Sequence, residues 1–221
     1  MKIDNPDERN FYEIEAATNN WSYRELERQY NSSLYERLVL SMEKKTIKRL
    51  SEKGQIISKS TDAVKDAYVL DFLDLEEQKQ YTESDLETAI INKLEHFLLE
   101  LGKGFLFVGR QQRITIEDEH FHVDLVFYNR FLHSFVLIDL KIGKLKHQDL
   151  GQMQMYVNYY DEYVITKEEN PTIGIVLCKQ KNETLVEITL PKGNRQIFAS
   201  KYQTVLPSKE ELKQLIENKN N

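Results

Sequence analysis

Two aspartates and a lysine stand at strand-like positions where a charged side chain is costly. Asp124 interrupts the apolar run of residues 121–128, and Asp139 and Lys141 end the apolar run of residues 135–142. Successive side chains of a strand point to opposite faces, so Asp139 and Lys141 share one face. Burying such charges costs free energy unless they are paired or bind a cation. These three residues therefore predict either a structural ion pair or a cation site.

Metal-assisted hydrolysis is the chemistry that such a set could perform. Carboxylates on adjacent strands and a backbone carbonyl offer the oxygen ligands that Mg²⁺ or Mn²⁺ prefers. A lysine beside them can position an attacking water and stabilise charge on a phosphoryl group. In the structural alternative, Asp139 pairs with Lys141 at a strand end and Asp124 caps a turn. The spacing alone leaves both interpretations open.

Two helices are predicted to flank the strands that carry these residues. The first begins near Thr82 and places Glu87 in its first turn, near the core-facing edge. The second spans about residues 148–163, where Gln152 and Tyr156 are four residues apart and share a face. Both helices are therefore expected to direct polar side chains toward the site.

Other polar residues admit a functional and a structural interpretation. Lys144 and Lys146 lie close to Lys141 in the sequence and form a basic strip that could contact phosphates, or a solvated turn. The pair His120 and His122 shares a strand face, but a zinc site would need further ligands, and a structural role is favoured.

The N-terminal part is predicted to be helical, with an apolar stripe that needs a partner. Leu26, Tyr30, Leu34 and Leu38 recur at helical spacing behind a capping box formed by Ser22 and Glu25. Such a stripe must be covered, and we expect a homodimer through the N-terminal helices, since two-fold dimers are the commonest assemblies. The alternative is that the stripe folds back onto the apolar segment 68–73.

The pattern of elements predicts an α/β fold. Strand-like runs and helices alternate so that a central mixed β-sheet is flanked by helices and preceded by a helical segment. We expect residues 1–62 to form that segment and a linker, and residues 63–221 to form the main domain. The expected strands lie at residues 105–116, 121–128, 135–142, 172–178 and 185–190, and a helix capped by Ser208 follows them.

Composition excludes several classes of protein. The 221 residues carry 30 basic and 36 acidic side chains, and Cys178 is the single cysteine, so neither a disulfide framework nor a cysteine-rich zinc site is expected. The apolar runs are too short to span a membrane, and the first residues lack the apolar run of a signal peptide, so a cytoplasmic protein is expected. The acidic excess lies in residues 1–88, which disfavours binding of nucleic acid by overall charge.

Several of these motifs together resemble the PD-(D/E)XK nuclease superfamily, its RecB-like branch, and most closely the C-terminal nuclease domain of the YhcG family. The resemblance covers most of the chain. It rests on Asp85-Leu86-Glu87, Leu98–Gly102, Phe107-Val108-Gly109-Arg110-Gln111, Val123–Tyr128, Asp139-Leu140-Lys141, Gly151-Gln152-Met153 with Tyr156, and Asn170–Gly174. Residues 21–29 and 34–38 resemble the last part of that family's N-terminal domain.

The resemblance implies a Mg²⁺- or Mn²⁺-dependent nuclease, with DNA as the predicted substrate and endonucleolytic cleavage as the predicted reaction. The resemblance implies that the catalytic residues are Asp124, Asp139, Lys141, Glu87 and Gln152. It implies that the metal is bound by Asp124, Asp139, Glu87 and the Leu140 carbonyl. The substrate would be bound by Tyr156, Gln111, Lys144 and Lys146.

The chain departs from the family pattern in three places. Asp139 stands where the family more often has Glu, Val123 stands where Pro is common, and the chain begins inside the usual N-terminal domain. These departures keep open an alternative in which an inactive nuclease fold serves as a DNA-binding or assembly module.

Overall fold

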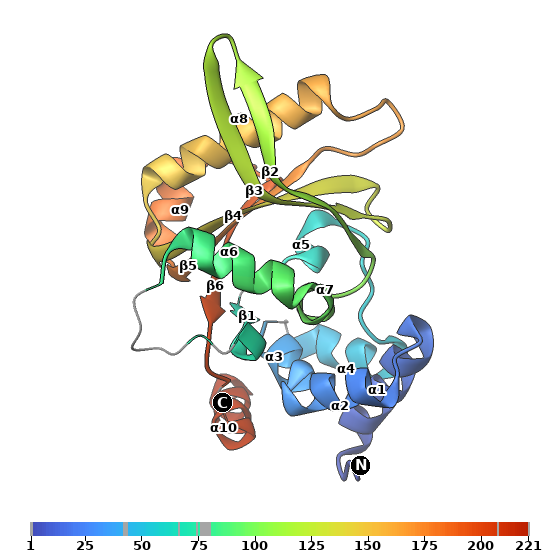
Figure 1. The fold of residues 1–221 in the computed structure, drawn as a ribbon. Coiled ribbons are helices and arrows are strands. Elements are labelled where there is room, and N and C mark those ends of the chain that lie inside the picture. Colours follow the sequence, from blue (N-terminus) through green and yellow to red (C-terminus); the bar gives the residue numbers. More distant parts are fainter. Residues whose placement is uncertain are drawn as a thin grey trace. The chain divides into compact units, whose positions relative to one another are not determined.

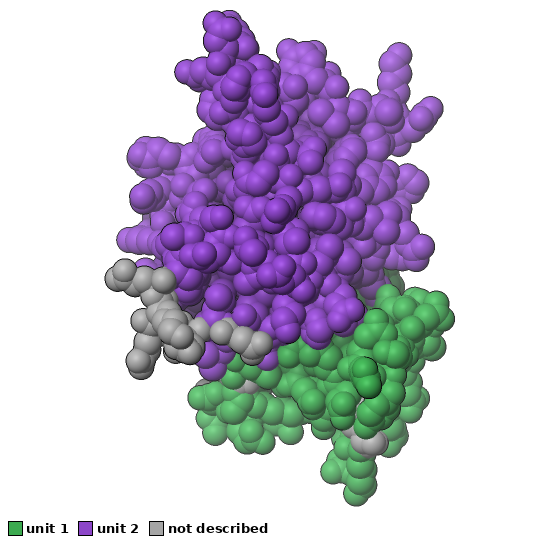
Figure 2. Space-filling model, viewed as in Figure 1, with its two compact units in different colours: residues 1–56, 206–221 green, residues 57–205 purple. Residues whose placement is uncertain are grey.

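The computed structural model forms two compact units, which Figure 2 distinguishes by colour. One comprises residues 1–56 and 206–221, and the other residues 57–205. The described residues are 2–41, 44–65, 67–73, 75, 81–206 and 208–220. The expected boundary between residues 62 and 63 falls inside the second unit, where Ser60 Oγ donates a hydrogen bond to the Arg195 carbonyl oxygen at 2.7 Å. The C-terminal helix, expected in the main domain, belongs to the first unit.

The first unit is a small helical cluster with its own apolar core. Its helices are α1 (Pro6–Asn19), α2 (Tyr23–Asn31), α3 (Leu34–Ser41), α4 (Lys44–Lys53) and α10 (Lys209–Asn220). The predicted capping box is present, because Ser22 Oγ accepts from the Glu25 amide and the Glu25 carboxylate accepts from the Ser22 amide. The stripe residues Leu34 and Leu38 are buried in this core, and Leu26 and Tyr30 pack against it. The apolar stripe that suggested a dimer is thus covered within its own unit.

The second unit is built on a mixed six-stranded sheet, in the order β1-β6-β5-β4-β3-β2. Strands β2, β3 and β4 form an antiparallel meander, whereas β4, β5, β6 and β1 pair in parallel. Their bounds are β1 (Ala67–Val69), β2 (Phe105–Ile116), β3 (Glu119–Asn129), β4 (Ser134–Lys144), β5 (Ile173–Gln180) and β6 (Ile197–Gln203). The expected α/β fold with a mixed central sheet is confirmed.

Helices cover both faces of this sheet and enclose two apolar cores. In Figure 1, α6 (Glu83–Asn92) and α7 (Leu94–Leu101) lie on one face, and α8 (His147–Tyr163) lies on the other. The first core contains Leu86, Phe97 and Phe127, and the second contains Val126 and Met153. The unit also contains α5 (Ser60–Ala63), a 3₁₀ turn (Asp71–Leu73) and α9 (Glu183–Thr189). In the part of the chain that the structure describes, we find no helix long and apolar enough to cross a bilayer.

The expected strand at residues 185–190 is wrong, because this segment forms helix α9. The Asn182 side chain accepts a hydrogen bond from the Leu185 amide at 3.1 Å and so caps the helix. The strand that completes the sheet is β6 instead, which pairs with both β5 and β1.

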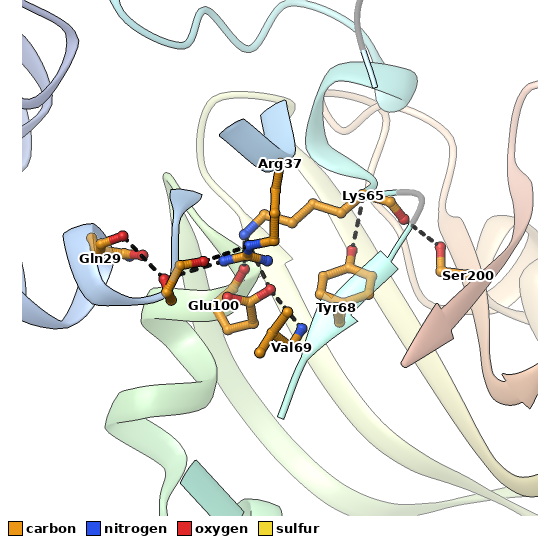
Figure 3. A network of polar contacts seen from close by, with 8 residues as sticks. Gln29, Arg37, Lys65, Tyr68, Val69, Glu100 and Ser200 are labelled. Atoms are coloured by element: carbon orange, nitrogen blue, oxygen red, sulfur yellow. Dashed lines mark hydrogen bonds and ion pairs between the residues drawn. The ribbon is translucent and has the colours of Figure 1, made fainter. Parts of the chain in front are cut away.

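A buried polar cluster fixes the short edge strand β1 to its neighbours within the second unit (Figure 3). Lys65 and Glu100 form an ion pair at 3.5 Å, and the Glu100 carboxylate also accepts from the Val69 amide at 3.0 Å. Tyr68 accepts from the Lys65 amide, and Ser200 on β6 donates to the Lys65 carbonyl oxygen. Since both charges are paired, their burial is tolerated.

Candidate active site

The candidate site lies where β3 and β4 separate. The two strands are paired from Asn129↔Ser134 to Leu125↔Ile138, and Asp124 is the next residue of β3 beyond the last pair. Asp124 Oδ2 accepts a hydrogen bond from the Leu140 amide at 2.7 Å. This side-chain bond links β3 to β4 just beyond the last backbone pair, and it holds Asp124 beside the segment of β4 that carries Asp139.

Asp139 and Lys141 form the buried pair that the strand pattern predicts. Lys141 Nζ lies 2.8 Å from Asp139 Oδ2, and Asp139 is only 2% exposed. Burial raises the pKa of Asp139 to about 7; Lys141 opposes this shift and Asp124 adds to it. Among the described residues, Asp139 Oδ2 has this ion pair but no hydrogen bond of regular geometry. A cation would satisfy this oxygen and lower the pKa.

Glu83 is a member of the site that sequence analysis missed. It is the first residue of α6, and its Oε2 lies 3.6 Å from Lys141 Nζ. Burial lowers the pKa of Lys141, but Asp139, Glu83 and Asp124 together outweigh it, and the pKa is raised above its usual value. Lys141 is therefore a cation held among carboxylates. The signal available in the sequence was that Glu83 precedes Glu87 by four residues and so shares its helix face.

Glu87 reaches the site through a glutamine. Gln111 Nε2 on β2 donates to Glu87 Oε2 at 2.5 Å and to Asp124 Oδ1 at 3.0 Å. Glu87 is buried, at 6% exposure. The predicted convergence of Glu87 and Asp124 is present in the structure, with the Gln111 amide between their oxygens. Gln111, predicted to contact substrate, is exposed at this position.

Helix α8 contributes a buried tyrosine, Tyr156, that bonds to the backbone of β3. The Tyr156 hydroxyl donates to the His122 carbonyl oxygen at 3.0 Å and accepts from Gln152 Nε2 at 2.5 Å. Burial, then the nearby Asp139 carboxylate, raises the pKa of Tyr156. Because its side chain is fully buried, Tyr156 positions β3 two residues before Asp124. The predicted roles of Tyr156 in substrate binding and of Gln152 in catalysis stay predictions.

The remaining predicted residues lie around this centre. Lys144 at the end of β4 and Lys146 before α8 are both exposed, and their contact with substrate stays a prediction. The role of the Leu140 carbonyl as a metal ligand also stays a prediction. A groove of about 1010 Å³ lies between the hairpin end near Glu117 and the face of α8 that carries Tyr159, and its lining includes none of the predicted site residues.

The donor chemistry of the site fits a hard divalent cation. Asp124 and Asp139 supply carboxylate oxygens, one of them buried without a regular hydrogen bond, and Glu87 is a third carboxylate nearby. Within the described residues, no three His, Cys, Asp or Glu side chains are already grouped closely enough to hold a metal ion. Binding by all three carboxylates would therefore require Gln111 to give up its bonds between Glu87 and Asp124.

The raised pKa of Asp139 predicts how stability changes with pH without metal. The unfolded carboxyl loses its proton near pH 4 and the folded one near 7, so the folded state binds more protons in this window and stability falls as pH rises. Asp139→Asn removes this effect. The measurement is the difference in thermal midpoint between Asp139→Asn and the wild type, both in chelator. We expect this difference to shift in favour of the variant by about 4 °C or more from pH 5 to pH 8. A difference that stays constant across this range would contradict the burial of an ionisable Asp139.

The mixed sheet carries Asp124 on β3 and the pair Asp139 and Lys141 on β4, where these two strands separate. These residues match the motif from which PD-(D/E)XK nucleases take their name. The family model described as "YhcG PDDEXK nuclease domain" matches residues 61–217, and the chain belongs to this family. This confirms the resemblance predicted from the motifs.

The chain is also similar to individual proteins. The chain is 41% identical over 212 residues to a protein of Escherichia coli (strain K12) named "Putative nuclease YhcG", covering 96% of this chain and 56% of that protein. The chain thus spans about half the length of the curated relative that it matches. Among solved structures, a repair endonuclease from Pyrococcus abyssi matches with TM-score 0.39 and 17% identity, over 59% of this chain and 50% of that one. The apo form of EndoMS matches with TM-score 0.35 and 16% identity, over 59% and 49%.

Proposed function

We propose that this chain is a Mg²⁺- or Mn²⁺-dependent endonuclease that hydrolyses phosphodiester bonds of DNA. The observation that carries the proposal is the hydrogen bond from the Leu140 amide to Asp124. It places Asp124 next to the buried Asp139–Lys141 pair, in the only part of the described sheet where β3 and β4 have separated. Membership of a nuclease family supports the same reaction.

Each residue has a role that follows from its contacts. Asp124 and Asp139 would hold the metal, which supplies a Lewis acid and a more acidic bound water when it is present. Lys141, a cation at the edge of the site, would stabilise the negative charge that develops on the phosphoryl oxygens. Glu83 keeps Lys141 at this edge, and Glu87 holds Gln111 against Asp124. Tyr156 fixes β3 from behind.

A panel of nucleic acids tests the reaction and its substrate. Supercoiled plasmid, linear duplex, branched DNA, single-stranded DNA and RNA are each incubated with Mg²⁺, Mn²⁺ or chelator. We expect cleavage of plasmid DNA with either metal and none with chelator. Failure of every substrate to be cut, by a protein that still binds DNA, would support the alternative of an inactive binding module.

The assembly and the location of the protein are separate proposals. A homodimer stays a prediction, although the stripe that suggested it is covered within the first unit. Light scattering of the chain tests it, and a monomeric mass at micromolar concentration would contradict it. We propose a cytoplasmic location, because the chain has a single cysteine, Cys178, which is buried and forms no disulfide.

A further inference from the structure

The hairpin of β2 and β3 extends past the rest of the sheet as a two-stranded arm. β3 pairs with β4 only from Leu125 onward, whereas β2 and β3 remain paired as far as Ile116↔Glu119. In the described part of the chain, residues 110–116 and 119–124 therefore have no third strand beside them, and Figure 1 shows this hairpin projecting beyond the sheet. Asp124 lies at the base of the arm.

The two faces of the arm differ in chemistry. Ile114, Phe121 and Val123 belong to the apolar core that α8 covers. Side chains alternate along a strand, so the neighbouring residues His120 and His122 point away from that core, on the face that carries Asp124. Arg113 is opposite His122 in the register, and all of these polar side chains except the partly buried Asp124 are exposed.

Three exposed side chains of the arm, Arg113, Thr115 and His120, form a hydrogen-bonded cluster. Arg113 Nε lies 3.1 Å from Thr115 Oγ1, an Arg113 terminal nitrogen lies 3.3 Å from His120 Nε2, and Thr115 Oγ1 lies 3.2 Å from His120 Nδ1. Arginine can only donate, so His120 Nε2 must accept, and the ring proton is on Nδ1. His120 Nδ1 then donates to Thr115 Oγ1, which already accepts from Arg113 Nε.

The direction of these bonds decides what the cluster presents to solvent. Both lone pairs of Thr115 Oγ1 and the lone pair of His120 Nε2 are used within the cluster. The Thr115 hydroxyl hydrogen and the other Arg113 N–H groups are therefore the groups that can donate to a ligand. A surface that offers donors and one fixed positive charge suits an anion.

We propose that this cluster, Arg113, Thr115 and His120, binds the phosphate backbone of the substrate strand and guides it along the arm to Asp124. The inference rests on the proposed function and names the surface that the nucleic acid would use. His120 is four residues from Asp124, or about 13 Å along the strand, so one backbone can reach both. We call this path along the arm, from the cluster to Asp124, the phosphate track. The turn residues Glu117, Asp118 and Glu119 are acidic and exposed, so they repel phosphate, and the track ends before the tip of the arm.

Binding of a labelled DNA duplex in chelator tests the track apart from cleavage. We expect Arg113→Ala to raise the Kd about fivefold to tenfold and to reduce the salt slope of log K by about one. Thr115→Val, which keeps the charge but removes the hydroxyl, is expected to raise the Kd about threefold. Arg130→Ala is the matched control, because Arg130 is an exposed arginine at the other end of β3; its Kd should stay within twofold of the wild type.

The outcomes separate this inference from the proposed function. An unchanged Kd and salt slope for Arg113→Ala, with a wild-type circular dichroism spectrum, would overturn the track even if the wild type cleaves DNA. A wild type that cleaves nothing, together with weakened DNA binding by Arg113→Ala, would overturn the nuclease and leave the track supported. A wild type that does not bind the duplex would overturn the track as well.

Discussion

Replacing Lys141 by methionine is expected to lower the rate of DNA cleavage at least ~1000-fold, or about 4 kcal/mol of transition-state stabilisation. Methionine fills the space of the lysine stem but carries no charge, so no cation faces the phosphoryl oxygens as charge develops on them. Asp139 also loses its ion-pair partner at 2.8 Å. Its pKa then rises further, because burial is no longer opposed, and the carboxyl becomes a poorer metal ligand.

Single-turnover cleavage of a labelled duplex in saturating Mg²⁺ measures this loss. Lys192→Met is the matched control, since Lys192 is an exposed lysine of the same unit, and its rate should equal that of the wild type. Mn²⁺ titration by calorimetry shows whether metal affinity has fallen as well. A Lys141→Met variant that folds and cleaves within tenfold of the wild type would remove Lys141 from the reaction.

Substitution of Asp124 is expected to give the second large loss of cleavage. Two variants, Asp124→Asn and Asp124→Ala, separate its contribution to catalysis from its contribution to stability. Asp124→Asn keeps an oxygen that can accept from the Leu140 amide, so the free energy of unfolding should change by less than about 1 kcal/mol. It removes the charge that binds metal, so cleavage should fall at least ~1000-fold. Asp124→Ala leaves the Leu140 amide without its acceptor, and we expect a further loss of about 1–3 kcal/mol in stability.

Urea unfolding in chelator, followed by circular dichroism, measures both stabilities beside the cleavage rates. Equal stability of Asp124→Ala and Asp124→Asn would show that the bond to the Leu140 amide contributes little. Residual cleavage by Asp124→Asn near the wild-type rate would contradict its role in binding metal, whatever the stability.

The pairing of Asp139 with Lys141 could be predicted from the sequence because it depends only on strand alternation. Residues two apart on one strand share a face, so Lys141 at the strand end lies beside Asp139, which the apolar run carries into the core. The family resemblance predicted Asp124, Glu87 and Tyr156 as site residues. Their contacts could not be predicted, because the Gln111 amide between Glu87 and Asp124 depends on how α6 packs on the sheet.

Strict alternation fails at the site itself, and the sequence gives no sign of it. It predicts that Val123 and Leu125 share a face, yet Val123 belongs to the core under α8 and Leu125 to the core under α6 and α7. Gln111, which lies across from Asp124, has a φ of 48°, outside the range of regular strands. Asp124 is linked through Gln111 to Glu87 of α6, whereas alternation from Leu125 would direct it toward α8. The irregularity lies where β3 loses its pairing with β4.

Asp139→Asn in a Mn²⁺ titration of plasmid cleavage tests whether Asp139 binds a metal that cleavage requires. Wild type and variant are compared at equal protein concentration, from chelator alone to saturating metal, with folding checked by circular dichroism. We expect no cleavage by either protein in chelator. With Mn²⁺, the wild-type rate should rise and saturate, and the rate of Asp139→Asn should be at least ~1000-fold lower at every concentration. Cleavage by the folded variant at the wild-type rate, or cleavage by the wild type in chelator, would contradict metal-dependent cleavage through Asp139.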